Sequence, residues 1–172
     1  MLSLLLLKRF LTVGVLFSAL FISVLMAESS PARMTPEKLH LVISGYADDV
    51  SPSNNVISFK YKSVSVYCIW DVNADRMRLV SPIVQVSELT PEHLTVALQA
   101  NYHTVLDARY AIGDGIIYSA FIHPLSSINK TELESAIRQV ATAALTFGNS
   151  YSSGELVFPK QSQQSPQGGK EL

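Results

Sequence analysis

The segment from Leu89 to Phe158 restricts the possible folds more than any other part of the sequence, because two helix starts flank a tight turn in it. Thr90-Pro91 predicts the first start, since the Thr hydroxyl can cap free backbone N–H groups and proline at the first helical position needs no donor. Gly113-Asp114-Gly115 predicts a hairpin turn, because Asp-Gly tolerates the positive φ angles that a tight turn requires. Asn129 and Glu132 have the spacing of a capping box and predict the second start.

The spacing of apolar residues gives the extent of these elements. In the first helix the expected buried stripe consists of Leu94, Ala97, Leu98, Asn101, Tyr102 and Val105. In the second helix it consists of Leu133, Ile137, Val140, Ala144 and Phe147. Hairpin strands are predicted over 108–112 and 116–123, and Glu155 to Phe158 is predicted to add a short edge strand.

The first half of the domain predicts one helix followed by three strands. Thr35-Pro36 begins a helix that is expected to continue to about Asp48, and turn-forming residues follow from 51 to 55. The period then changes to 2, which predicts strands over 56–62, 64–71 and from Arg76 to Pro82, where the proline should end the pairing. The resulting order, α-β-β-β-α-β-β-α, predicts an α+β domain with an antiparallel sheet of about five strands and three helices packed against it.

The N-terminal 27 residues have the layout of a secretory signal peptide. Lys8 and Arg9 precede an apolar run that extends to Met26, and Ala27 offers a cleavage site. The alternative is an uncleaved membrane anchor formed by residues 10–27, because the run is close to the length that spans a bilayer. We therefore expect an exported protein that is either periplasmic or secreted. The predicted organisation is a leader over 1–27, a single α+β domain over 28–158 and a disordered polar tail over 159–172.

Composition excludes several classes of function and of stabilisation. The formal net charge of −1 gives no sign of bulk affinity for nucleic acid. Cys68 is the single cysteine, so no intrachain disulfide can form. Its place between apolar residues of a predicted strand favours a buried, inert thiol over a reactive one.

Candidate catalytic and metal-binding groups do not combine into a site. His103 and Asp107 could share one side of a helix, but a third metal ligand would have to come from His93 or His123, which have no partner nearby in the sequence. Ser126 follows His123 closely, yet no Gly-x-Ser-x-Gly elbow surrounds it, and serines before a helix are usually caps. We predict no catalytic site, no metal site and no cofactor, and hence no enzyme.

The face of the sheet opposite the helices is the predicted functional surface. We expect Ile57, Met77 and Tyr110 to face the helices, together with every second residue along their strands, such as Ile112. The residues between them then place cations and apolar groups on the other face. These candidate residues are Lys60, Lys62, Tyr67, Ile69, Arg76, Arg78, Arg109 and Phe121. Cations alone would only keep an open sheet soluble, but the apolar members point to a partner. We expect this face, or an adjacent strand edge, to hold a peptide or an anionic segment.

Four segments carry a resemblance to a known family. They are residues 64–71, residues 76–82, residues 94–101 and residues 107–110. Their order resembles the type III secretion chaperone-like fold, and in particular the putative bacterial sensory transduction regulator family, over roughly residues 35 to 147. The resemblance implies small, often dimeric, non-enzymatic binders. Type III chaperones hold an extended segment of a client protein.

These observations predict an exported, non-enzymatic protein-binding or chaperone-like domain. Two alternatives stay open. One is a regulatory or accessory subunit of an envelope assembly, and the other is a small-molecule-binding protein or enzyme, which would need an enclosed pocket with converging polar groups. The expected partner is a protein or peptide, with a homodimer left open, and the membrane is a partner only if the leader is uncleaved.

Overall fold

The computed structural model describes residues 33–154, which belong to one compact unit. The predicted leader, the predicted strand from Glu155 to Phe158 and the predicted tail lie outside the described residues. Within residues 33–154 the helices are α2 (Pro36–Ser44), α3 (Pro91–His103), α4 (Lys130–Thr146) and the short 3-10 helix η1 (Val86–Glu88). The strands are β1 (Asp48–Ser53), β2 (Val56–Tyr61), β3 (Val64–Asp71), β4 (Arg76–Gln85), β5 (Arg109–Gly113) and β6 (Ile116–His123).

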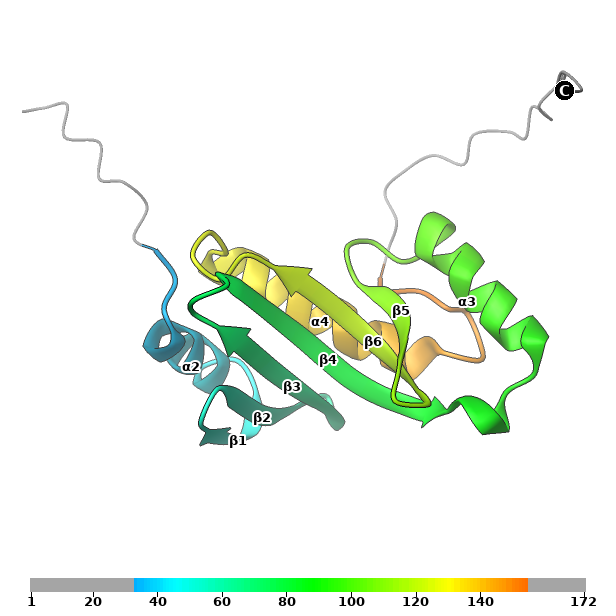
Figure 1. Ribbon diagram of the computed structural model, residues 1–172, viewed down its shortest axis with the longest axis horizontal. Coiled ribbons are helices and arrows are strands. Elements are labelled where there is room, and N and C mark those ends of the chain that lie inside the picture. The colour runs from blue at the N-terminus through cyan, green and yellow to red at the C-terminus, as the bar shows by residue number, and fades with distance from the viewer. Residues whose placement is uncertain (1–32, 155–172) are drawn as a thin grey trace, which may run out of the picture. The chain divides into compact units, whose positions relative to one another are not determined.

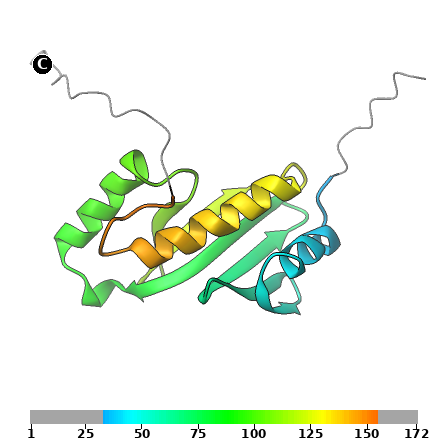
Figure 2. The ribbon, with the colours of Figure 1, turned by 180° about the vertical axis from the view of Figure 1, so that it is seen from behind.

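The six strands form one antiparallel sheet in the order β1-β2-β3-β4-β6-β5, and the α+β class is as expected. Helix α4 lies across one face of this sheet, where it contacts every strand from β2 to β6 (Figure 2). Helix α2 contacts β1 and α4, and α3 contacts β5 (Figure 1). Residues 33–154 therefore form a two-layer structure, and no helix of this range lies on the second face of the sheet (Figure 1).

The core lies between α4 and the covered face of the sheet. Helix α4 contributes Leu133, Ala136, Ile137, Val140 and Ala143, all fully buried. The sheet contributes alternate residues, among them Ile57, Val66, Cys68, Met77 and Leu79. Each large apolar side chain buried in this way contributes about 1.5–3 kcal/mol relative to exposure, so this interface stabilises the fold strongly.

The predicted helix caps and the hairpin turn are confirmed. Thr35 Oγ1 accepts from the N–H of Lys38, and Asn129 exchanges hydrogen bonds of 2.9 and 3.0 Å with Glu132. Asp114 and Gly115 have φ values of 49° and 76° in the turn that joins β5 to β6. These features depend on neighbouring residues only, which is why the sequence reveals them.

Strand β1 was not predicted, and it replaces the end of the expected first helix. Helix α2 ends at Ser44 rather than near Asp48, and Asp48–Ser53 pairs antiparallel with β2. The segment has no period of 2, because its ladder is irregular between Asp48 and Ser51 and Asp49 has a φ of 52°. An irregular edge strand of this kind is specified by its partner rather than by its own pattern.

The prediction that Pro82 ends the pairing of its strand is wrong. Strand β4 continues to Gln85, and Pro82 lies opposite Tyr118 of β6. Pairing between β3 and β4 reaches only to Val80, so Pro82 has a strand neighbour on one side alone. A proline is tolerated at such a position because only one side has to supply a ladder, and a register shift follows directly between Pro82 and Val84.

The predicted stripe of α3 is also partly wrong. Its buried residues are Ala97 and Ala100, whereas Leu98 and Tyr102 are 70% and 86% exposed. The two alanines face inward where α3 contacts β5, and Val96 packs partly buried against the core. Leu98 and Tyr102 lie on the outer side of the helix.

Candidate protein-binding face

The uncovered side of the sheet, called the open face below, is defined by alternate residues of β3, β4 and β6. Its residues are Tyr67, Ile69, Arg76, Arg78, Val80, Tyr118, Ala120 and Ile122. Strand pairing places them in rows that cross the sheet. One row runs from Ile69 through Arg78 to Ile122, and the next from Tyr67 through Val80 to Ala120. Ile122 is 63% exposed and Tyr67 is 37% exposed, so apolar surface reaches solvent.

Four of the five arginine and lysine residues predicted for this side differ in how strongly their charges are already engaged. Lys60 Nζ lies 2.9 Å from Asp49 Oδ2, and this partner raises the pKa of Lys60. The guanidinium of Arg109 donates to the carbonyls of Leu106 and Ala108, so it lies over the loop before β5. Among residues 33–154, Arg76 and Arg78 make no ion pair. The guanidinium of Arg76 does donate to the carbonyl of Asp75 at 3.0 Å, so Arg78 is the cation of this set with the fewest partners in that range.

Arg76 and Arg78 are not equivalent. Asp71 lies directly opposite Arg76 on β3, and its Oδ1 accepts from the N–H groups of Asn73 and Ala74 at 2.9 and 3.0 Å. Arg78 instead lies between Ile69 and Ile122. A guanidinium with apolar neighbours is the stronger attraction for a carboxylate, because less of its charge is offset locally.

Two predicted residues of the site lie elsewhere. Phe121 is 9% exposed and pairs with the buried Leu79, which places it on the covered face rather than on the open face. Lys62 is in the turn between β2 and β3, where its Nζ lies 5.7 Å from the centroid of the Tyr61 ring. Tyr61 follows the buried Ile57 and Phe59 at strand spacing, so Lys62 leans away from the open face.

Sequence reasoning missed Val80, Tyr118, Ala120 and Ile122. Both alternating sets of β6 contain apolar residues, so the pattern of this strand does not fix which set is inside. The hairpin could have fixed it. A tight turn at Asp114-Gly115 pairs Tyr110 with Ser119, and a helix-facing Tyr110 then places Ser119 and Phe121 on the covered face.

The border of the sheet at β5 is closed by side chains. The side-chain amide of Asn101 accepts from the N–H of Tyr110 at 2.8 Å and donates to its carbonyl at 3.1 Å. Gln139 Oε1 accepts from the N–H groups of Asp107 and Ala108 at 2.8 and 3.2 Å. The groups that an added strand would use at the start of β5 are thus already bonded.

The border at β1 is closed in a different way. Pro52 lacks the N–H that a ladder needs, and the strand is irregular between Asp48 and Ser51. Asp49 and Lys60 add charge at this border. Proline, irregular pairing and charge at an edge strand are all ways in which natural sheets prevent further strands from joining.

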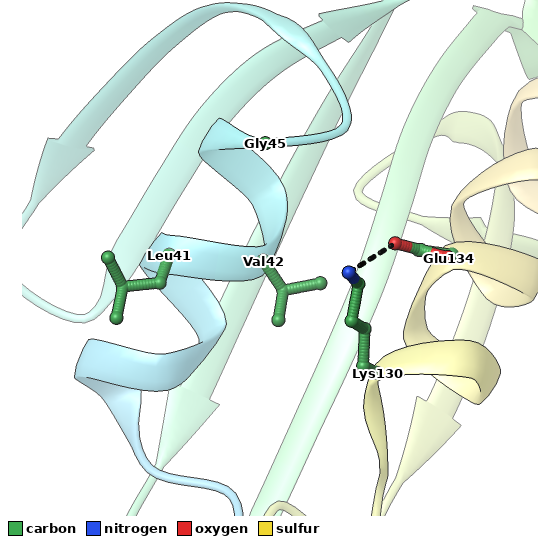
Figure 3. A pocket seen from close by; sticks show the side chains of 5 residues that line it. All are labelled: Leu41, Val42, Gly45, Lys130 and Glu134. Carbon is green, nitrogen blue, oxygen red and sulfur yellow. Dashed lines mark ion pairs between the residues drawn. The ribbon is translucent and has the colours of Figure 1, made fainter.

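A shallow groove of about 250 Å³ lies between α2 and α4 (Figure 3). Leu41, Val42 and Gly45 form one wall, and an ion pair of 3.8 Å between Lys130 and Glu134 forms the other. Its volume is below the roughly 300–1,000 Å³ of most small-molecule sites. Only the one ion pair supplies polar groups, so this groove does not resemble the enclosed pocket that a small-molecule site would need.

Two of the histidines make local contacts with the loops that surround them, and the cysteine is buried. His93 completes the capping box of Thr90, and His123 Nδ1 lies 2.9 Å from the carbonyl of Pro124. Between residues 33 and 154 no group of three or more His, Cys, Asp or Glu side chains could hold a metal ion. Burial raises the pKa of the Cys68 thiol to about 12, as expected for an unreactive thiol. No helix in the same range is long and apolar enough to cross a membrane.

Comparisons with known proteins give a likeness in structure but none in sequence. No family model matches the chain, and neither does any curated protein. A chain of the solved HopA1–SchA chaperone–effector complex is similar in structure, with a TM-score of 0.47 and 10% sequence identity over 63% of this chain and 94% of that chain. Membership in the sensory transduction regulator family stays a prediction.

Proposed function

We propose that this protein is an exported, non-enzymatic protein-binding domain that holds a segment of a partner protein on its open face. The observation that carries the proposal is the composition of that face. An antiparallel sheet with one solvated side normally shows polar residues there. Here Ile69, Val80 and Ile122 lie beside Arg78 instead, which makes no ion pair with any residue that the structure describes.

The face has the properties of an interface rather than of ordinary surface. Aromatic and arginine side chains are enriched in the centres of protein interfaces, and the open face contains Tyr67, Tyr118, Arg76 and Arg78. Contiguous exposed apolar groups usually mark binding sites. The cations lie on a chain whose formal net charge is −1, so they mark a local preference for acidic partners.

Charge reversal tests the proposal. The change is Arg76→Glu with Arg78→Glu, and the matched control is Lys38→Glu with Lys130→Glu, which alters the charge equally at exposed residues away from the open face. Partners crosslinked in living cells and identified after purification should be lost with the first variant and retained with the control, because only the first repels an acidic segment from the face. An unchanged set of crosslinked partners would exclude the open face as the site.

The same experiment separates the remaining alternatives. Many partners that share an extended or helical segment indicate a chaperone-like binder. One large partner that copurifies in fixed proportion indicates an accessory subunit of an envelope assembly. The mass of the mature protein from cell fractions tests export, since a full-length, membrane-bound species would contradict cleavage after the leader.

A further inference from the structure

We propose that the segment held on the open face is an amphipathic helix with acidic residues in its first turn, rather than a strand added to the sheet. This inference rests on the proposed function, and it names the conformation and chemistry of the partner. Three observations carry it: the closed borders of the sheet, the dimensions of the open face, and the position of its free cations.

The closed borders argue against strand addition. A peptide that joins a sheet obtains its affinity from main-chain pairing with an edge strand. Asn101 already satisfies both backbone groups of Tyr110 on the outer side of β5, and Gln139 satisfies the N–H groups just before it. Pro52 and the irregular ladder close β1. Main-chain pairing is therefore obstructed at both borders of the sheet, which favours a partner that contacts the face through side chains.

The dimensions of the open face suit a helix. Its tall apolar side chains lie on β3 (Tyr67 and Ile69) and on β6 (Tyr118 and Ile122), with β4 between them. Two strand spacings make roughly 10 Å, which is about the diameter of a helix with its side chains. In the row that begins at Tyr67, the positions on β4 and β6 have the short side chains of Val80 and Ala120, which leave room for a ridge. Helix α4 uses the other face of the same sheet in this way (Figure 2).

The position of the cations sets the polarity of the helix. Arg76 and Arg78 are at the beginning of β4, and the apolar rows continue from there toward Pro82. Carboxylates are favoured in the first turn of a helix, where the macrodipole is positive. A helix with Asp or Glu in its first turn would place these carboxylates over Arg78 and run in the direction of β4. From Arg76 to Pro82 a strand extends roughly 20 Å, which about 14 helical residues match.

Two synthetic peptides of identical composition test the inference. The first has leucines at helical spacing and glutamates in its first turn, and the second has the same residues in an alternating, strand-like order. Titrated into the isotope-labelled protein as purified from cells, the first should bind and shift backbone amide signals of β3, β4 and β6. The replacement Ile122→Glu should weaken binding by about tenfold, as for loss of a central apolar contact.

A control with matched exposure is available on the opposite side of the domain. Leu145 on α4 is 61% exposed, against 63% for Ile122, so Leu145→Glu makes the same change of chemistry away from the open face. This variant should bind the helical peptide as the unmodified protein does. Arg78→Glu provides a second variant on the face, and it should bind the peptide with acidic residues in its first turn more weakly than the unmodified protein does.

Each contrary result has its own meaning. Preferred binding of the alternating peptide, with new protection of amides at Ile112 or within Asp48–Ser53, would overturn the helix and leave the proposed function standing. Binding of the helical peptide that Ile122→Glu does not weaken would place it elsewhere and also overturn the inference. Binding of neither peptide would count against both proposals.

Discussion

At the scale of single residues, the carboxylate of Asp75 joins two turns that are 51 positions apart in the chain. Its oxygens accept from the N–H and the hydroxyl of Ser126 at 2.7 and 2.8 Å, and its backbone carbonyl accepts from the N–H of Leu125 at 3.3 Å. The bonds from Ser126 lower the pKa of Asp75, and Arg33 and Arg76 add to this effect. One side chain thus attaches the β3–β4 turn to the loop before α4.

This link predicts a dependence of stability on pH. A carboxyl whose pKa is lower in the folded chain than in the unfolded chain stabilises the fold above its unfolded pKa, and this contribution is lost as the pH falls through the folded value. Ser126→Ala should therefore lower the melting temperature at neutral pH and reduce its fall on acidification. Asp114→Asn, in an exposed turn, is the control, and it should not change how far the melting temperature falls on acidification. If the melting temperatures of Ser126→Ala and of the unmodified protein fell by the same amount on acidification, the role of Asp75 would be contradicted.

At the scale of elements, the β5–β6 turn depends on backbone conformation and not on space. Gly115 has a φ of 76°, and a Cβ built on it would meet nothing within 4 Å. Gly45, at the end of α2, has a φ of −86°, and a Cβ there would be in ordinary contact at 3.6 Å with the carbonyl oxygen of Leu41. Substitution of Gly115 would therefore test backbone strain alone, whereas substitution of Gly45 would test an ordinary contact without strain.

Alanine at each glycine should have opposite effects. Gly115→Ala should lower the free energy of unfolding by about 1–2 kcal/mol, because an L side chain is strained at positive φ. Gly45→Ala should be neutral or stabilise by up to about 1 kcal/mol, since it restricts the unfolded chain without strain in the folded one. Chemical denaturation of both variants measures the difference. Equal losses would show that the hairpin does not require the left-handed conformation at Gly115.

The elements that the sequence predicts correctly are those defined by neighbouring residues. The caps at Thr35 and Asn129 and the turn at Asp114 involve partners within three or four positions. Strand β1 escapes such reasoning because its ladder with β2 is irregular. Leu98 fits the helical period, yet it is exposed, because Ala97 and Ala100, with the partly buried Val96, form the inward side of α3.

The candidate site was predictable to the extent that strand alternation was unambiguous. Strand β4 alternates clearly between Arg76, Met77, Arg78 and Leu79, and its pattern predicts the face on which the two arginines lie. Strand β3 is apolar on both sides in its middle, but the polar Ser65 and Asp71 at its ends share a face with Tyr67 and Ile69 and indicate the correct side. Strand β6 is apolar on both sides, and Phe121 was assigned to the wrong one. The ion pair of Lys60 and the bonds of Arg109 depend on tertiary structure, which single-strand patterns do not contain.

At the scale of the whole molecule, Cys68 reports on global opening. It is fully buried beneath α4 at the centre of the sheet, and its raised pKa of about 12 keeps it protonated. A thiol reagent should therefore modify it only when the domain unfolds, so the labelling rate should follow the unfolding rate as denaturant is added. Ser65→Cys in the Cys68→Ser background places an exposed thiol on the same strand and should react at once. Fast labelling of Cys68 in native conditions would reveal local opening of the sheet.

The burial of this one thiol also decides how the fold responds to the redox state of its surroundings. Thiol reagents of the cell, such as glutathione or disulfide-exchange enzymes, act on thiolates that they can reach. Neither condition holds for Cys68. The folded domain therefore needs no oxidant to become stable and offers none a target, so it would keep the same structure in a reducing cytosol and in an oxidising envelope.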